Sequence, residues 1–144
     1  MDKSGKLKPA IIIVDSLNLL NGDNSQSEYD INTKNIKKLK NLSKKLNCSV
    51  IVLSQLVLNN RLDRRPNLSD LKKVGDLESI ADQIILLYQG DEYDTYSRKI
   101  DIVELIVAKN RNGLRGTVEL VHFKNYGLFV AIDRNETKDI KTVT

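Results

Sequence analysis

The stretch Ile11-Ile-Ile-Val-Asp15 decides how the chain folds. Ala10 to Val14 is an uninterrupted apolar run of mostly β-branched residues, which is typical of a strand covered on both faces in a parallel sheet. Ligands of open α/β sheets bind outside the carboxyl ends of such strands. Because Asp15 is the residue that ends this run, we expect its carboxylate at the functional edge of a parallel sheet.

A helix and a second strand are expected downstream of Asp15. The segment Asn32 to Leu46 places apolar residues at helical spacing, with lysines over the remaining surface. These lysines are expected to form a solvated face. The run Ser49 to Leu53 is a second short apolar strand, which ends at Ser54 and Gln55. Strand, helix and strand in this order predict a βαβ unit with a right-handed crossover.

The second half of the chain has a different pattern. A basic, polar connection runs from Val57 to Asp76, in which Leu71 and Leu77 can anchor short helical turns, and Gln83 to Tyr88 predicts a third strand. Three further runs, separated by glycine-containing connections, indicate antiparallel strands. These runs are Ile100 to Ala108, Thr117 to Phe123 and Leu128 to Ile132. The sequence therefore predicts an α/β fold whose parallel sheet is extended by antiparallel strands.

The composition is that of one globular domain. The chain has 144 residues, of which 40% are hydrophobic and 29% charged, and its net charge of +4 is a mild excess. The expected domain spans residues 10–132, between an N-terminal extension at 1–9 and a frayed polar tail at 133–144. No run approaches the roughly 20 apolar residues of a membrane span. No export signal is indicated, so the expected location is the cytoplasm.

Two polar side chains are predicted at one edge of the parallel sheet. One carboxylate held by a rigid strand, here that of Asp15, can organise Mg²⁺ through oxygen ligands or bound water, which is the Walker B arrangement. Many strands of doubly wound proteins end in aspartate for other reasons. Gln55 strengthens the interpretation, because its amide can donate and accept hydrogen bonds and so report on a terminal phosphate. A glutamine after a strand is otherwise a polar loop residue.

A pair of cations ends a later strand. Lys109 and Arg111 alternate along an extended chain that enters a hairpin at Asn112-Gly113, so both side chains can point the same way. Two cations that project together suit the charge spread over a transferring phosphoryl group. The alternative is a basic hairpin tip that keeps a sheet edge soluble.

Taken together, these motifs occur in an order that is more specific than any one of them. They are Ile11-Ile-Ile-Val-Asp-Ser-Leu-Asn-Leu-Leu20, Val52-Leu-Ser-Gln-Leu56, Arg65-Pro66, Ser69-Asp-Leu71, Ala81-Asp82, Ala108-Lys-Asn-Arg-Asn-Gly113 and Gly116-Thr-Val-Glu-Leu120. The set resembles the DnaB-type replicative DNA helicases over about residues 10 to 130. The resemblance implies the C-terminal half of a RecA-like P-loop NTPase fold.

The resemblance also implies roles for individual residues. Helicases of this family work as hexamers that use ATP and Mg²⁺ to unwind duplex DNA while moving along a single strand. Asp15 matches the Walker B carboxylate that holds Mg²⁺, and Gln55 matches the residue that couples the nucleotide state to the DNA-binding loops. Lys109 and Arg111 match the pair that reaches the neighbouring subunit's ATP, where such an arginine is worth roughly 10³ to 10⁵ in rate.

DNA contacts follow from the same resemblance. Lys72, Lys73 and Gly75 align with the loop that follows single-stranded DNA by its phosphates, and the preceding Arg64 and Arg65 extend the expected DNA-binding surface. Lys73 stands where the family usually has an acidic residue, so we expect stronger single-strand binding with a steeper salt dependence. Other helicase subunits, a primase and a helicase loader are the implied protein partners.

The chain departs from the family in other respects. Ser16 and Asn18 stand where tyrosine and glutamine are usual. The chain contains no Gly-x-x-x-x-Gly-Lys-Ser/Thr stretch, and no glutamate can be assigned as the base that activates water. We expect the phosphate-binding loop, the helix after it and the N-terminal collar to lie upstream of Met1. A lone subunit is therefore expected not to hydrolyse ATP measurably, although it can still offer Lys109 and Arg111 to an intact neighbour.

Two other functions are consistent with parts of the sequence. The chain can be a non-catalytic module that joins an intact helicase ring and modulates it. Alternatively, Ile13-Val-Asp-Ser-Leu-Asn18 resembles the first motif of NYN and PIN-like metal-dependent nucleases, which need further acidic residues converging on the metal. Asp82 is the nearest candidate, but it precedes its strand and is expected at the opposite sheet edge.

Overall fold

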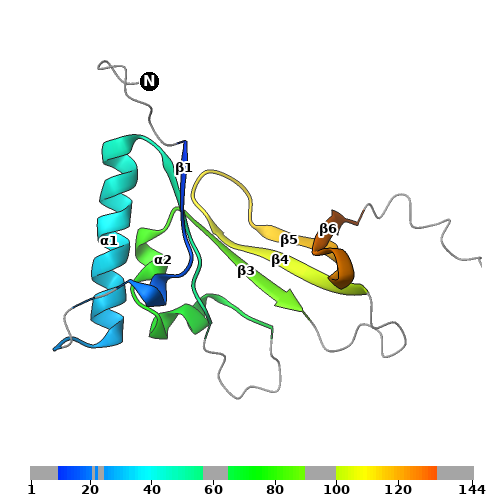
Figure 1. Cartoon of the computed structure of the whole chain (residues 1–144), viewed down its shortest axis with the longest axis horizontal. Coiled ribbons are helices and arrows are strands. Elements are labelled where there is room, and N and C mark those ends of the chain that lie inside the picture. Colours follow the sequence, from blue (N-terminus) through cyan, green and yellow to red (C-terminus); the bar gives the residue numbers. More distant parts are fainter. Residues whose placement is uncertain (1–9, 21, 23–24, 57–64, 90–99, 133–144) are drawn as a thin grey trace, which may run out of the picture. The chain divides into compact units, whose positions relative to one another are not determined.

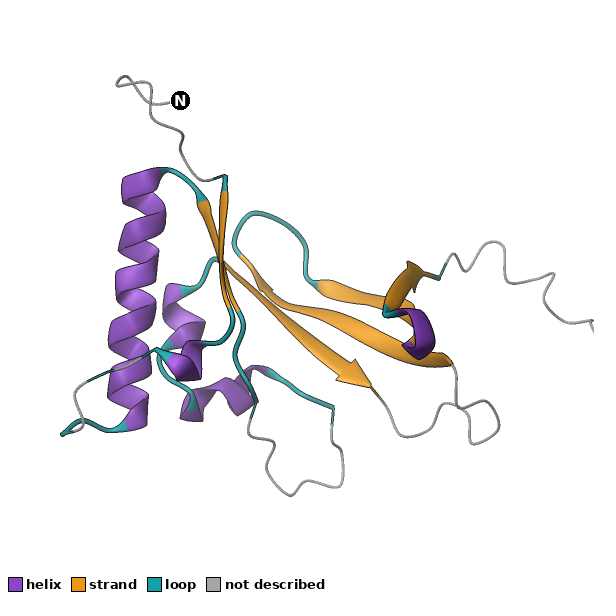
Figure 2. Ribbon diagram, viewed as in Figure 1, coloured by secondary structure: helices purple, strands orange, loops and turns teal. Residues whose placement is uncertain are grey.

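The computed structural model describes residues 10–20, 22, 25–56, 65–89 and 100–132 (Figure 1). The chain divides into two compact units, and each is described by itself. The first unit comprises residues 1–62 and 67–82, and the second comprises residues 63–66 and 83–144. The first combines helices with a parallel strand pair, and the second is built on antiparallel strands (Figure 2). The predicted extension at 1–9 and tail at 133–144 lie outside the described residues.

The parallel strand pair of the first unit confirms the predicted βαβ order. Strand β1 (Ile11–Val14) pairs with β2 (Ser49–Val52) in parallel, with Ile11 opposite Ser49 and Val14 opposite Val52. Helix α1 (Glu28–Leu46) connects the two strands. The expectation that β1 is covered on both faces was wrong: Ile11 and Ile13 are 56% and 66% exposed. Alternating exposure along both strands shows that the described residues cover only one face of the pair.

Helix α1 begins four residues before the predicted Asn32 because of its cap. The Ser27 hydroxyl oxygen accepts a hydrogen bond from the Asp30 amide at 3.2 Å, and Glu28 and Asp30 place negative charge in the first turn. The helix ends as predicted at Leu46, followed by Asn47 in the left-handed conformation with φ of 49°. These caps account for the extra turn that apolar spacing alone did not indicate.

The core of the first unit joins three segments that are distant in sequence. Leu17, Ile36 and Val74 are buried together, and Leu17, in the short 3₁₀ helix η1 (Leu17–Leu19), has no exposed surface. Partly buried side chains pack against them: Leu20, Val52, Leu77 and Ile80. The connection predicted from Val57 to Asp76 is outside the described residues at 57–64. Beyond Asn67 it forms the 3₁₀ helix η2 (Leu68–Lys73), and the helix α2 (Leu77–Ile80) follows it.

The second unit is a four-stranded antiparallel sheet in the order β3-β4-β5-β6. Its strands are β3 (Gln83–Gln89), β4 (Ile100–Asn110), β5 (Gly116–Phe123) and β6 (Leu128–Ala131). Each lies at a predicted strand, within two residues at either end. A 3₁₀ helix, η3 (Lys124–Tyr126), and Gly127 with φ of 59° make the turn into β6. The α/β class with parallel and antiparallel strands is confirmed, and the described strands form two separately hydrogen-bonded sheets.

One face of the antiparallel sheet is apolar and buried at its centre. Ile84 and Leu86 of β3 and Ile106 of β4 are at most 9% exposed. The register between β3 and β4 shifts between Ile84 and Ile85, where β4 accommodates an extra residue.

Among the described residues, no helix is long and apolar enough to cross a membrane.

Candidate functional site

The carboxyl ends of β1 and β2 bring Asp15 and Gln55 to one edge of the parallel pair. The ladder extends past the last paired residues, since the Leu53 amide donates to the Val14 carbonyl at 2.9 Å and the Leu17 amide donates to the Leu53 carbonyl at 2.8 Å. Asp15 directly follows β1, and Gln55 lies three residues beyond the end of β2. Both side chains are exposed, so this strand edge presents one carboxylate and one amide to solvent.

The surroundings of Asp15 determine which metal chemistry the edge can support. In the part of the chain that is described, no hydrogen bond or ion pair occupies its carboxylate, and no group of three or more His, Cys, Asp or Glu side chains could enclose a metal ion. A dedicated protein cage is therefore not formed by these residues. Mg²⁺ is commonly held by one or two carboxylates together with waters and substrate phosphates. A single exposed carboxylate at a strand end fits that mode of binding.

The predicted cations lie on the β4–β5 hairpin of the second unit. Lys109 is half-buried in β4 and lies opposite Ile84 of β3, whereas Arg111 is exposed in the turn that follows β4. Strand β4 ends at Asn110, so the two cations do not share one extended strand as the alternation argument assumed. The turn itself sets the direction of Arg111.

Asn110 organises this turn and was not singled out in the sequence. Its side-chain Nδ2 donates to the Leu114 carbonyl at 3.1 Å, and its Oδ1 accepts from the Asn112 amide and from Gln83 Nε2, both at 3.2 Å. An asparagine side chain that bonds the backbone two residues on forms an Asx turn, a known signal of turn formation. Asn110 therefore holds the segment between the two cations in place.

The predicted DNA loop of the first unit has a fixed base and an exposed basic end. Asn67 and Asp70 form a capping box at the start of η2, in which Asp70 Oδ2 accepts from the Asn67 amide at 2.8 Å. Asp70 is 2% exposed, whereas Lys72 and Lys73 at the end of η2 are exposed. The start of η2 is therefore held by hydrogen bonds within the protein, whereas the lysines at its end face solvent.

Gly75 is required by packing, independently of any ligand. Its φ is +146°, and a Cβ at this position would lie 3.2 Å from the Thr33 backbone nitrogen and 3.3 Å from Asn32 Cβ. The next amide, that of Asp76, donates to Thr33 Oγ1 at 3.0 Å. The base of the loop is thus attached to α1 through Thr33, which sequence reasoning had not identified.

Arg65 is engaged within the second unit. Its Nε donates to Glu104 Oε2 at 2.8 Å, Nη2 lies 2.6 Å from the same oxygen, and Nη2 donates to Thr117 Oγ1 at 3.1 Å. This geometry connects the segment before Pro66 to β4 and β5, so it gives Arg65 a structural role. Arg64, the other arginine of the predicted DNA surface, lies outside the described residues.

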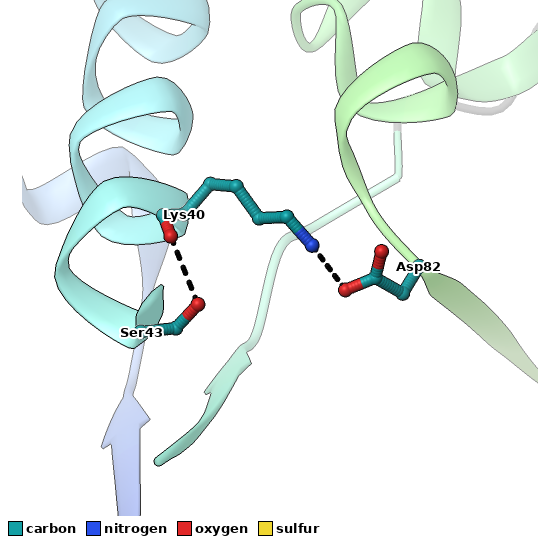
Figure 3. A network of polar contacts seen from close by, with 3 residues as sticks. All are labelled: Lys40, Ser43 and Asp82. Atoms are coloured by element: carbon teal, nitrogen blue, oxygen red, sulfur yellow. Dashed lines mark hydrogen bonds and ion pairs between the residues drawn. The ribbon is translucent and has the colours of Figure 1, made fainter. Parts of the chain in front are cut away.

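Asp82 does not join Asp15 in a metal site. It directly precedes β3, as predicted, and its carboxylate is paired with the Lys40 ammonium of α1, while Ser43 Oγ donates to the Lys40 carbonyl at 2.9 Å (Figure 3). A carboxylate neutralised by a lysine is a poor metal ligand. Within the described ranges, the structure therefore gives the nuclease interpretation no group of acidic residues at Asp15.

Comparison with known proteins identifies the family. The family described as the DnaB-like helicase C terminal domain matches residues 2–131. The chain belongs to this family. Similar curated proteins include replicative DNA helicase DnaC of Bacillus subtilis (strain 168) and replicative DNA helicase DnaB of Geobacillus stearothermophilus. Each is 38% identical over 131 residues, which cover 86% of this chain and 28% of that protein.

Solved structures agree with the family and with the fold. One of them, described as an ATPase domain, has a TM-score of 0.79 at 39% sequence identity, covering 92% of this chain and 48% of that one. A DnaB-like replicative helicase, solved in a study of its interactions with primase, gives the same TM-score and identity, and the match covers 92% of this chain and 32% of that one. The RecA-like α/β fold is thereby confirmed. The chain spans less than a third of the length of the curated relatives quoted above.

Proposed function

We propose that this chain acts as the C-terminal part of the ATPase motor of a replicative DNA helicase, which moves along single-stranded DNA as a hexamer and unwinds the duplex. The observation that carries the proposal is the pair of adjacent parallel strands that lead into Asp15 and Gln55, in a chain whose family is the DnaB-like helicase C-terminal domain. A cytoplasmic location follows from this function.

The proposed chemistry at the strand edge involves ATP and Mg²⁺. Asp15 holds the ion, directly or through a bound water, beside the terminal phosphates. Gln55 lies two residues after Leu53, and the Leu53 amide and carbonyl are hydrogen-bonded to Val14 and Leu17 on either side of Asp15. A displacement of the backbone at Asp15 is therefore transmitted to the segment that carries Gln55. Gln55 in this position reports the presence of the terminal phosphate to the segment that follows it.

Lys109 and Arg111 supply the second half of the proposed nucleotide site. Their positive charge stabilises the phosphoryl group bound by a neighbouring subunit, where each cation offsets charge that develops on the transferring oxygens. The sequence contains no glycine-rich phosphate loop. We therefore propose that these 144 residues do not hydrolyse ATP by themselves and that Lys109 and Arg111 act on the nucleotide of a neighbouring subunit that has this loop.

The proposed DNA contact is the exposed end of η2. Lys72 and Lys73 bind phosphates of the single strand, while Gly75 keeps the base of the loop against α1. For Arg65 a structural role within the second unit is proposed instead, since its guanidinium is bonded to Glu104 and Thr117. Primase is proposed as a further partner, because a structural relative was solved in a study of its interactions with primase. A helicase loader is proposed on the family resemblance alone.

The test mixes the chain with an intact replicative helicase, such as the Bacillus subtilis relative, and measures ring assembly and ATPase rate. With the unmodified chain, we expect mixed rings that retain ATPase activity. With Arg111→Ala, the ATPase rate at the mixed interface should fall at least about tenfold. Arg115→Ala, an exposed arginine four residues further on, is the matched control and leaves the rate unchanged.

Two results of the mixing experiment contradict parts of the proposal. Mixed rings whose ATPase rate is the same with Arg111→Ala and with the unmodified chain support a non-catalytic module that modulates the ring. Complete absence of association with the intact helicase contradicts any role of this chain in a hexamer.

A further inference from the structure

Helix α1 carries a positive charge equal to that of the whole chain. It contains six lysines and two carboxylates, a net charge of +4, and the net charge of the 144 residues is also +4. The other 125 residues therefore balance 17 basic against 17 acidic side chains. Such an imbalance on one helix creates a local positive potential that a neutral remainder does not cancel.

Five of the six lysines lie on the side of α1 that faces away from the core. We call this group the lysine face: Lys34, Lys37, Lys38, Lys44 and Lys45, all exposed. The opposite side of the helix buries Asn32, Asn35 and Ile36. Lys40 is the exception, since it is half-buried and paired with Asp82 (Figure 3). In the part of the chain that is described, none of the five has an ion-pair partner.

The stability of the helix does not account for the lysine face. Lys44 and Lys45 complement the helix dipole in the last turn, but Lys34, Lys37 and Lys38 lie in the interior. Lys34 is three and four residues from Lys37 and Lys38, and like charges at these spacings on a helix repel one another and destabilise it. Asp30, four residues before Lys34, offsets part of this repulsion, but the helix contains no carboxylate after Asp30, so Lys37 and Lys38 have no acidic partner on the helix.

We propose that the lysine face binds the phosphate backbone of a DNA strand. From Lys34 to Lys45 the helix rises about 16 Å, a length over which one strand of B-form DNA presents about five phosphates. The charges are compact ammonium groups without arginine or an aromatic side chain among them, which suits contacts that do not read sequence. Protein interfaces are instead depleted in lysine and organised around buried aromatic anchors, so an acidic protein is a poorer match.

This DNA contact rests on the proposed helicase function but is separate from the proposed DNA loop. Gly75 and Asp76, at the base of that loop, pack against Asn32 and Thr33 on the core side of α1. A strand held by Lys72 and Lys73 and a strand held by the lysine face therefore use different surfaces. The lysine face would thus be a second DNA-binding surface of the motor, in addition to the loop formed by η2.

The test measures binding of an oligothymidylate to the full chain by fluorescence anisotropy over a range of salt concentrations. In the triple variant Lys37→Gln, Lys38→Gln and Lys45→Gln, we expect the slope of log Kobs against log salt to decrease in magnitude by about 2, since each phosphate contact on a single strand contributes about 0.7. The matched control replaces the same three lysines by arginine, which keeps the charge and therefore the slope.

The double variant Lys72→Gln and Lys73→Gln distinguishes DNA binding by the lysine face from DNA binding by the loop. If it lowers the slope and the triple glutamine variant does not, the lysine face is overturned and the proposed DNA loop stands. If only the triple variant lowers the slope, the loop is overturned and the lysine face stands. Failure of the unmodified chain to bind at low salt overturns both, and tighter binding of poly-glutamate than of DNA overturns the choice of DNA as partner.

Chemical acetylation of lysines provides an independent measurement within one helix. Bound DNA should slow the modification of the lysine face several-fold, as read by mass spectrometry. Lys40 is the internal control, because its ammonium is already paired with Asp82, and its modification rate should not change. Equal protection of all six lysines contradicts the proposal, since it indicates general stabilisation of the helix by the ligand.

Discussion

The two units use charged side chains in different ways. In the antiparallel sheet of the second unit, Asp101 is 9% exposed, and its Oδ2 is 2.6 Å from both Gln89 Nε2 and Lys124 Nζ, while Glu104 is bonded to Arg65. At the parallel strand edge of the first unit, Asp15 is exposed, and no hydrogen bond or ion pair of its carboxylate is found among the described residues. A bonded carboxylate contributes to stability, whereas an exposed one at a strand edge is available to a ligand. Mutations that separate stability from ligand binding test this difference.

The largest expected effect lies two residues from Asp15. Leu17→Ala removes a side chain with no exposed surface from the core that it forms with Ile36 and Val74, which should lower the free energy of unfolding by about 2 to 5 kcal/mol. Asp15→Ala should change it by less than about 0.5 kcal/mol, because that side chain is exposed. Urea denaturation followed by circular dichroism measures both. Similar values for the two variants would show that Asp15 also belongs to the structural core.

The second effect concerns a bonded carboxylate. Asp101→Ala leaves Gln89 and Lys124 without their acceptor, and we expect a loss of about 1.5 to 3 kcal/mol in the free energy of unfolding, the range for hydrogen bonds to charged groups. The control is Arg115→Ala, an exposed side chain just before β5, which should change the free energy of unfolding by less than about 0.5 kcal/mol. A loss below about 0.5 kcal/mol for Asp101→Ala would remove the distinction between the two units.

A smaller effect is expected at Arg65. Arg65→Gln breaks the paired contact with Glu104 and the hydrogen bond to Thr117, but the arginine side chain is 44% exposed, so solvent screens much of the interaction. We expect a loss of about 0.5 to 1 kcal/mol in the free energy of unfolding. If Arg65 acts on DNA directly, the variant should instead lower the salt slope of DNA binding by about 0.7 without a change in stability.

The smallest effect is expected for the ion pair at the start of β3. Lys40→Gln removes the partner of Asp82, but the two side chains are 25% and 47% exposed, and such pairs contribute about 0 to 1 kcal/mol. Lys37→Gln, on the exposed side of the same helix, should leave stability unchanged or slightly raised, because it relieves repulsion from Lys34. Thermal melts of the two variants provide the comparison, and a loss above about 2 kcal/mol for Lys40→Gln would indicate a buried network.

The strands were predictable because their patterns are local. Ile11–Val14 is an apolar run that ends at Asp15, and Gly116–Phe123 is an alternating run between Arg115 and Lys124, so their positions follow from the sequence. The edge location of Asp15 follows in the same way from the end of a strand. The start of α1 was missed, because it depends on the Ser27 cap and not on apolar spacing.

Other features depend on contacts between distant residues and could not be predicted. Nothing in the local sequence indicates that Arg65 bonds Glu104, that Lys40 pairs with Asp82, or that Gly75 packs against Thr33. The extended geometry assumed for Lys109 and Arg111 also failed, since the strand ends at Asn110 and the side chain of Asn110 builds the turn. The roles of the site residues in ATP and DNA binding stay predictions until the proposed experiments are made.

The attachment of Gly75 and Asp76 to Thr33 has a mechanical consequence. A force applied to the basic end of η2 reaches the first turns of α1 directly, because the Asp76 amide is bonded to Thr33 Oγ1 and no side chain separates Gly75 from the helix backbone. The helix is a stiff rod of 19 residues that leads into β2, the strand followed by Gln55. The same first turns of α1 also hold the segment after Asp15, because Asn35 Nδ2 donates to the Leu20 carbonyl at 3.2 Å. If η2 binds DNA as proposed, tension on the strand reaches the edge that carries Asp15 through these turns and not along the length of the helix.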